Sequence, residues 1–227
     1  MSIAYFLTTD DGAFAEGLMP RLVERPEVIA ASLFTPDQAE DPYVDDKAPP
    51  ALMLEIDVAD TDALDAVFND AAIRASIEAA GPSAKADAFE ALAFPIEGVD
   101  DPAIRTAPMS FVVRYYGPVT DEKLFVQYYL DKHPPILAEM PGIRNVFCYR
   151  PVPWSNPIQI PMSGCILGNE VVFDNLGDLN AALASEVRHR LREDYNSFPV
   201  LPGPNTHYAM QRMDFRRQAG FRPILDS

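Results

Sequence analysis

The chain of 227 residues has few of the residues on which disulfides and metal sites depend. Its two cysteines, Cys148 and Cys165, form no Cys-x-x-Cys pair. This sparse pattern excludes a disulfide-stabilised secreted mini-protein, and we interpret both as free, buried thiols in a reducing compartment. The three histidines lie far apart, so no metal-ligand pattern is present. A glycine-rich phosphate loop and a Gly-x-Ser-x-Gly elbow are also absent.

Positive charge and long apolar runs are scarce as well. The chain has 18 lysines and arginines against 34 aspartates and glutamates, and a net charge of −16. Such a surface repels nucleic-acid phosphates and anionic lipids, so we expect neither nucleic acid nor a membrane as a partner. No apolar run reaches the ~18 residues that span a bilayer. The first residues also lack the basic segment of a secretory signal, and we therefore predict a cytoplasmic protein.

Prolines, by contrast, are abundant. The chain contains 22, and many fall in two stretches, residues 35–50 and 151–161. Long ordered loops in compact domains frequently carry function. We therefore expect both proline-rich stretches to form ordered loops of this kind.

An internal repeat is visible at a constant spacing. Residues 26–34 and 141–149 each consist of a proline followed by a short strand-like run, 115 positions apart. The strand-like segments 55–58 and 170–173, and the helical segments after them, have the same spacing. Repetition of several elements at one spacing indicates a duplicated unit.

Each unit has strand-like and helix-like patterns in the order βαββαβ, which is that of the ferredoxin-like split βαβ motif. We predict an α+β fold in which the two units pack their bare sheet faces together, giving a barrel with helices outside and a cavity inside. The predicted parts are a degenerate first repeat (1–98), a linker (99–108), a second repeat (109–217) and a tail (218–227).

The expected element bounds follow from the same patterns. The first strands align at a spacing of 108 and the second strands at 115, so the second repeat has seven extra residues in its first helix. We expect first strands at 3–8 and 110–116, first helices at 11–24 and 121–140, third strands at 52–58 and 170–173, second helices from 60–62 and 177–178, and last strands at 89–96 and 207–215.

The longer helix of the second repeat carries the predicted chemistry. Phe125, Tyr129 and His133 are four residues apart and share one helix face. His133 precedes Pro134, and a residue before proline is pushed out of helical geometry. We therefore expect His133 at a helix break, with its ring reaching beyond the sheet edge.

Strand alternation predicts which other side chains line the cavity. In residues 110–116 the apolar face should pack on the helices, whereas Arg114 and Tyr116 should face the cavity. The same alternation places Glu170 and its repeat partner Glu55 on the cavity side.

These residues carry a family resemblance. The second repeat resembles the EthD family of the dimeric α+β barrel superfamily, in which tryptophan is common at the position of Tyr129, and the match covers Met109 to Arg217. Members of the superfamily include cyclases, isomerases, decarboxylases and monooxygenases. Tandem members that isomerise or de-esterify ring-opened lignin aromatics look broadly similar to this chain. The shared pattern is Phe125-x-x-Tyr128-Tyr129-x-x-x-His133-x-Pro135-x-Leu137, followed by Pro141-Gly142-Ile143.

The leading hypothesis is a cofactor-independent enzyme of aromatic catabolism. It would isomerise a small conjugated, carboxylated ring-fission product by proton transfer, or hydrolyse its ester. His133 is the expected acid or base, Tyr116 and Tyr129 the expected proton donors, and Arg114 the expected carboxylate ligand. The further candidate substrate-binding residues are Glu170, Trp154, His207 and Tyr208.

Two alternatives stay open. The chain could be a non-catalytic small-molecule-binding or stress protein, or a haem-dependent oxidoreductase, because related barrels bind haem. Trp154 could cover a substrate or anchor its loop. The sequence leaves open the substrate, a homodimer formed through exposed barrel edges, and a contribution of the first repeat to the site.

Overall fold

The computed structural model describes residues 2–15, 17–46 and 48–216. Strands and helices follow each other in the same order in both halves of the chain. The strands are β1 (Ser2–Thr9), β2 (Val28–Pro36), β3 (Leu52–Val58), β4 (Lys85–Ala93), β5 (Met109–Tyr116), β6 (Asn145–Pro151), β7 (Cys165–Phe173) and β8 (Asn205–Phe215). The helices are α1 (Leu18–Glu24), α2 (Thr61–Phe68), α3 (Ala71–Glu78), α4 (Glu122–Leu137), α5 (Leu176–Leu183) and α6 (Glu186–Tyr195).

The strands close into one barrel in the order β1-β3-β2-β8-β5-β7-β6-β4. Strands of the N-terminal half (residues 2–93) run β4-β1-β3-β2, and those of the C-terminal half (109–215) run β8-β5-β7-β6. The halves join along two antiparallel seams, β2 with β8 and β4 with β6. The predicted fold class, an α+β barrel of two ferredoxin-like units, is confirmed. The predicted tail (218–227) lies outside the described residues.

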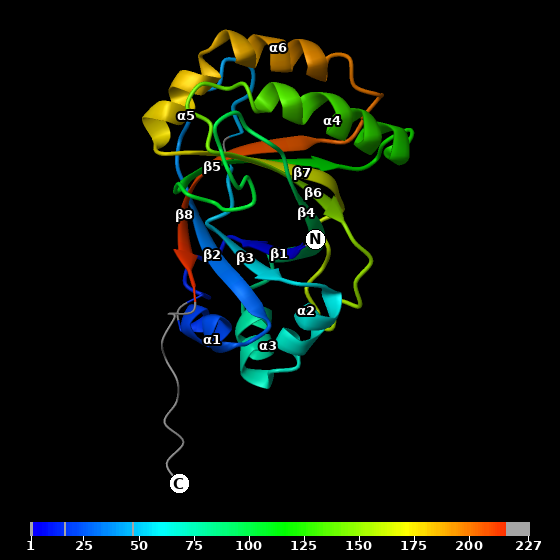
Figure 1. Cartoon of the computed structure of the whole chain (residues 1–227). Coiled ribbons are helices and arrows are strands. Elements are labelled where there is room, and N and C mark those ends of the chain that lie inside the picture. The colour runs from blue at the N-terminus through cyan, green and yellow to red at the C-terminus, as the bar shows by residue number, and fades with distance from the viewer. Residues whose placement is uncertain (1, 16, 47, 217–227) are drawn as a thin grey trace.

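Helices cover the barrel on two opposite sides, which gives three layers (Figure 1). One apolar cluster joins α1, α2 and α3 to the N-terminal half of the barrel, and a second joins α4, α5 and α6 to the C-terminal half. A third cluster fills the barrel. This division follows from strand geometry, because successive side chains point to opposite faces.

The strand alternation predicted from the sequence is confirmed. Phe111 and Tyr115 of β5 belong to the cluster under the helices, whereas Val112 and Tyr116 face the barrel interior. Glu170 of β7 also points inward, where it accepts a hydrogen bond from Ser110. Alternation therefore separates two chemical environments on the two faces of the same strands.

The predicted cavity inside the barrel is wrong, because the described side chains fill the barrel centre. Aromatic rings and other large side chains occupy the interior, among them Phe6, Phe34, Phe89, Phe147 and Tyr149. Packing at this density leaves no room for a ligand at the barrel centre. A site for a small molecule must therefore lie at the barrel ends or under the helices.

The predicted helix break at His133 is also wrong. Helix α4 continues through Pro134 and Pro135 to Leu137. A proline inside a helix removes one backbone hydrogen bond, but His133, Pro134 and Leu137 are all buried, and their packing keeps the helix continuous. Neither α4 nor any other described helix is long and apolar enough to cross a membrane.

Other element bounds differ from the expected ones. Helix α1 begins only at Leu18, because Gly17 has a φ of 75°, a left-handed backbone that an α-helix does not allow. Each expected second helix is a pair, and Asp70 starts the second member of the first pair by capping α3. Strands β4, β7 and β8 begin at Lys85, Cys165 and Asn205, earlier than expected.

Candidate active site

A cavity of about 70 Å³ lies between the sheet of the C-terminal half and helices α4 and α6. Apolar side chains of β5, β7 and the helices form much of its wall, and His133, Asn169 and His207 are among its polar groups. The cavity is therefore on the helix side of the sheet, outside the barrel. Its two histidines make it the described pocket with the most potential for acid–base chemistry.

His133 enters the cavity from α4 as half of a buried pair. Its Nδ1 lies 2.8 Å from Oδ2 of Asp194 on α6, and its ring packs against Tyr129 and Phe198. Burial lowers the pKa of His133, and Asp194 opposes this by raising it. A neutral imidazole must donate Nδ1–H to the carboxylate, which leaves Nε2 as a proton acceptor.

Asn169 reaches the cavity from β7. Its Nδ2 donates to the hydroxyl of Tyr129, and its Oδ1 is buried with no donor among the described residues. Burial raises the pKa of Tyr129 well above its usual value. An unpaired buried oxygen costs free energy, so Oδ1 is placed to accept a hydrogen bond from a bound ligand.

His207 forms a second histidine–carboxylate pair, which joins the two halves of the chain. Its Nδ1 lies 3.2 Å from Oδ2 of Asp46, and its backbone N–H donates to the same oxygen. Burial lowers the pKa of His207, while Asp46 raises it. Asp46 belongs to the loop between β2 and β3, and Val44 of the same loop lines the cavity, so the N-terminal half does contribute to this site.

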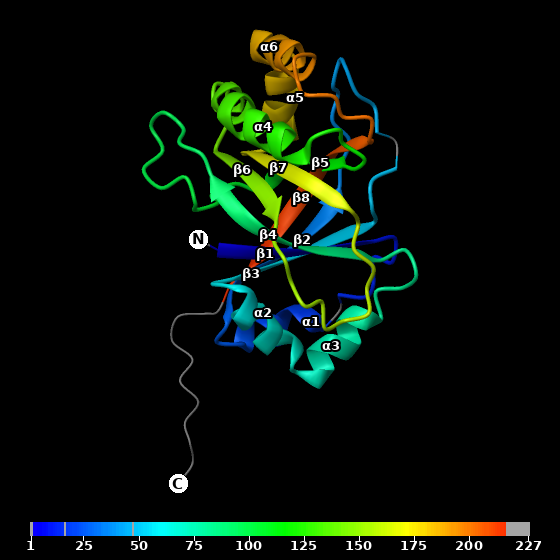
Figure 2. The ribbon, with the colours of Figure 1, turned by 90° about the vertical axis from the view of Figure 1, so that its right-hand side faces the viewer.

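That loop covers the cavity, and we call residues 37–46 the lid loop. It rises from the N-terminal half to lie beside α5 and α6 (Figure 2). Asp41 accepts two hydrogen bonds of 2.9 and 3.0 Å from Arg188 of α6. Tyr43 contacts His189 and lies under the guanidinium of Arg188. These buried and aromatic contacts hold the first proline-rich stretch over the pocket.

A larger space of about 430 Å³, here called the vestibule, lies under the lid loop. Val44, Phe111 and His207 line both the vestibule and the cavity. The two spaces are therefore neighbours, separated by these shared side chains.

The equivalent space in the N-terminal half carries apolar side chains. Helices α2 and α5, and the starts of α3 and α6, keep the 115-residue spacing, and strand registers align the last strands. Among the described residues, this replacement of polar by apolar groups leaves the polar set in the C-terminal half. The equivalent pairs are Leu18 for His133, Leu54 for Asn169, Ala88 for His207, Ile73 for Arg188 and Ile77 for Arg192.

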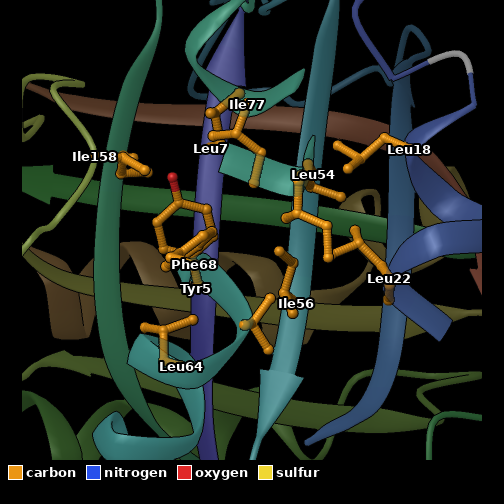
Figure 3. Close-up of a cluster of buried hydrophobic side chains, with 14 of the residues drawn as sticks. Tyr5, Leu7, Leu18, Leu22, Leu54, Ile56, Leu64, Phe68, Ile77 and Ile158 are labelled. Carbon is orange, nitrogen blue, oxygen red and sulfur yellow. The ribbon is translucent and has the colours of Figure 1, made fainter. Parts of the chain in front are cut away.

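The second proline-rich loop completes the filling of that half. Trp154 packs against Tyr5 and Phe68, and its Nε1 donates to Asp65 at 2.8 Å. Ile158 joins the same buried cluster, where it lies beside Tyr5 (Figure 3). Trp154 therefore contacts the opposite helical layer from His133 and anchors its loop.

Glu170 lies in a buried ionic cluster inside the barrel, not in the cavity. It accepts hydrogen bonds from Arg105 (3.2 Å), Arg212 (3.3 Å), Ser110 (2.6 Å) and Tyr149 (2.6 Å). Arg105 comes from the predicted linker and also binds Glu55 and Asp57. Glu170 is thus fully engaged with the protein.

The structure brings together only part of the predicted site. His133, Tyr129 and His207 lie at the cavity, whereas Arg114 and Tyr116 lie at one end of the barrel interior. Tyr208 packs against the barrel cluster and borders the vestibule. In the described part of the chain, no group of three histidine, cysteine or carboxylate residues is placed to hold a metal ion.

Sequence reasoning missed Asp194, Asn169 and Asp46. Asp194 lies 61 positions from His133, and Asp46 lies 161 positions from His207. No local motif marks these pairs, because helix packing and a loop between the halves create them. The sequence does contain one indication of Asn169. It aligns with Leu54 at the 115-residue spacing, so it is a polar residue on a strand face that is apolar in the other half.

No family model matches this chain, and no curated protein matches it. Solved structures do. An anthrone oxidase-like protein is similar with a TM-score of 0.61, 14% identity and coverage of 99% of this chain and 96% of that one. A candidate monooxygenase from Lactobacillus acidophilus NCFM has a TM-score of 0.55, 10% identity and 93% coverage of both chains. A candidate chlorite dismutase has a TM-score of 0.52, 12% identity and coverage of 94% and 95%. These likenesses show the dimeric α+β barrel fold.

The predicted isomerase or ester hydrolase activity is wrong against these findings, because the similar structures carry oxidoreductase names. The geometry supplies a physical reason. The predicted mechanism needed His133, Tyr116 and Arg114 around one substrate. The sheet of the C-terminal half lies between His133 and the other two.

Proposed function

We propose that this protein is an oxidoreductase that oxidises a small hydroxylated aromatic compound with dioxygen, in the cavity under α4 and α6. The observation that carries the proposal is the buried His133–Asp194 pair facing a largely apolar cavity. The names of the similar structures, an anthrone oxidase-like protein and a monooxygenase, support the reaction class.

The proposed chemistry begins with proton removal. Nε2 of His133 takes a proton from a phenolic hydroxyl or from a CH₂ group that the ring activates, and Asp194 stabilises the imidazolium. The resulting anion is electron-rich, and its carbon forms a bond to dioxygen, which takes up two electrons and becomes a hydroperoxide after protonation. Loss of the second C–H proton then breaks the O–O bond and supplies the remaining two electrons of the four-electron oxidation. One oxygen atom becomes the new carbonyl of the product, and the other leaves as water, so that CH₂ and O₂ become C=O and H₂O. Oδ1 of Asn169 accepts a hydrogen bond from a substrate hydroxyl.

A haem group does not fit this site. The donor chemistry would be suitable, because Asp194 holds Nδ1 of His133 and Nε2 would remain to bind an iron. The space beside Nε2 is not suitable, because pockets for drug-sized ligands measure roughly 300–1,000 Å³, whereas the cavity that His133 lines measures about 70 Å³. The larger vestibule is lined by other residues, so it adds no room directly at this nitrogen. In the proposed reaction His133 therefore acts as a base and not as an iron ligand.

The substrate must also use the vestibule. A cavity of roughly 150 Å³ is needed to enclose benzene, which exceeds the about 70 Å³ present. The vestibule adds about 430 Å³ once the lid loop moves. A ligand of two or three fused rings would then place only the reactive edge of one ring at His133, with most of its ring system beneath the lid loop.

We also propose that the two halves are duplicated units, with the EthD-like unit at 109–217 and the degenerate unit at 1–98. The equal spacing of α2 with α5 and of α3 with α6 supports this proposal.

An oxygen electrode tests the proposed reaction. The purified protein is mixed with phenols, naphthols and anthrones, and oxygen uptake is recorded with the visible absorbance of the quinone. We expect uptake of one O₂ per substrate molecule for at least one fused-ring compound. Binding detected by thermal shift without oxygen uptake across the whole panel would contradict the proposal and favour a non-catalytic binding protein.

Asp46→Asn is expected to raise KM about tenfold, because it weakens the lid loop's bond to His207. Asp65→Asn is the matched control, because it removes the equivalent tether of Trp154 over the N-terminal half. Its KM should be unchanged. Equal effects of the two substitutions on KM would mean that the lid loop has no special part in substrate binding.

A further inference from the structure

A second pocket lies at one end of the barrel, across the sheet from the cavity. It is small, about 20 Å³, and Arg114, Tyr116, Lys85, Thr8 and Ser163 contribute to its lining. A cavity needs a volume of ~10–15 Å³ to hold one water molecule. The pocket therefore accommodates a single small group.

Arg114 is a buried cation without a carboxylate partner among the described residues. Its residue surface is 6% exposed. Nη1 donates to the backbone oxygens of Val113 (3.1 Å) and Asn169 (3.3 Å), whereas Nη2 is buried and has no protein acceptor. A buried guanidinium with an unused donor is costly unless an anion or solvent satisfies it.

The chain treats its other buried arginines differently. Arg105, Arg188 and Arg212 each have a carboxylate within ion-pair distance. Arg114 instead lies against the faces of Phe6 and Tyr149, with its Cζ 4.6 and 5.0 Å from the ring centroids. These rings hold the guanidinium in place and leave its charge available.

The backbone is also shaped around this side chain. Gly168 of β7 faces Arg114, and a Cβ at that position would lie 2.6 Å from Nη1. Glycine therefore makes room for the guanidinium between the two strands. A substitution of Gly168 by alanine would push Nη1 away from its backbone acceptors.

Asp87 is the carboxylate that lines this pocket, and its oxygens accept hydrogen bonds from Ser163. Both the hydroxyl and the backbone N–H of Ser163 donate to Asp87. Burial raises the pKa of Asp87, and the bonds from Ser163 and the charge of Arg114 oppose that rise. With Lys85 at the pocket rim, two cations face one carboxylate in a chain whose net charge is −16.

We propose that this end of the barrel binds a small monovalent anion through Nη2 of Arg114, either chloride or the carboxylate group of a small metabolite. Tyr116 and Lys85 also line this pocket. Sulfate and phosphate are too large for the space. The site is separate from the His133 cavity and does not depend on the proposed oxidation.

Thermal unfolding in a chloride-free buffer tests the proposal. Ionic strength is held constant with sodium sulfate while chloride, bromide, formate or acetate is titrated. We expect the Tm to rise with the logarithm of the anion concentration, because a ligand bound only to the folded state stabilises it. A response to chloride and bromide alone identifies a halide site, and a stronger response to formate or acetate identifies a carboxylate site.

Arg114→Met should abolish the anion-dependent rise in Tm, whereas Lys85→Met should weaken it only a few-fold. Asp87→Asn removes the nearby negative charge and should tighten anion binding about tenfold. A folding defect cannot produce tighter anion binding. Asp87→Asn therefore tests the proposal even if Arg114→Met does not fold. Broadening of the ³⁵Cl nuclear magnetic resonance line measures chloride binding directly. An identical anion response in wild type, Arg114→Met and Asp87→Asn would overturn the proposal and leave water as the partner of Nη2.

Discussion

His133→Ala is expected to lower kcat for aromatic oxidation by about 10²–10⁴-fold, the usual worth of a positioned general base. The side chain lies in the cavity, paired with Asp194 at 2.8 Å. Oxygen uptake at saturating substrate measures the effect, with a thermal unfolding curve to show that the variant is folded. Full retention of kcat would remove His133 from the mechanism.

The pH dependence of kcat should report the same histidine. Burial lowers the pKa of His133 below its usual 6.5, so the neutral, basic form dominates at neutral pH. Activity should therefore fall only as the pH drops below about 6.5. If the fall in kcat on acidification were instead centred above pH 7, the base would be a group other than His133.

Asp194→Asn separates positioning from catalysis. Asp194 raises the pKa of His133, so its removal should move the acidic limb to lower pH and lower kcat about tenfold or more. Asp65→Asn, at the other helical layer, should change neither the limb nor kcat. If kcat fell but the pH at which activity is lost in acid stayed the same, Asp194 would have only a structural role.

Glu170→Gln is expected to destabilise the fold by about 3–5 kcal/mol, because it leaves Arg105 and Arg212 short of a buried counter-charge. For a protein of this length that corresponds to a fall in Tm of about 6–20 °C. Burial raises the pKa of Glu170, but Arg105, Arg212, Ser110 and Tyr149 together lower it to about 2. The carboxylate form is thus the one that the barrel requires.

Glu55→Gln provides the matched control, since Glu55 is the counterpart of Glu170 in the N-terminal half and binds the same Arg105 at 2.6 Å. Burial raises its pKa well above the usual value, with repulsion from Asp57 and Glu170 adding to the rise and Arg105 opposing it. Because its charged form is less favoured by its surroundings than that of Glu170, glutamine at this position should cost less than about 1.5 kcal/mol. Equal losses of Tm in the two variants would refute the assigned asymmetry.

Acid titration gives an independent check on Glu170. Its pKa is lowered in the folded state, so its stabilising contribution is complete above about pH 4.5 and is lost as the pH falls towards about 2. The wild type should lose Tm across that window more steeply than Glu170→Gln. Parallel acid profiles of the two proteins would contradict the assignment.

The sequence allowed the barrel to be predicted because its signals are periodic. Alternation in β5 separated Phe111 from Arg114 correctly, and α2 and α5 do lie 115 positions apart. Burial overrode the local signals elsewhere. The packing of Leu137 and His133 kept α4 helical through two prolines.

The candidate site was predictable only in part, because its partners come from distant segments. His133 carries a motif, but Asp194 and Asp46 meet their histidines through packing between helices and between halves. The error over Arg114 had a different origin. Polar residues on an inward strand face suggested a shared cavity, whereas aromatic rings and Arg105 fill the space between them.

Each of the two proline-rich loops packs against the helices of the other half. The loop after β2 contacts α6 through Asp41, and the loop after β6 contacts α2 through Trp154. Together with the strand pairings β2–β8 and β4–β6, these loops mean that each half buries surface and pairs strand edges of the other half. A chain cut between β4 and β5 should therefore give two fragments that cannot persist alone and that reassemble by complementation when mixed. The cavity would form only on reassembly, because Asp46 and His207 would then arrive on separate molecules.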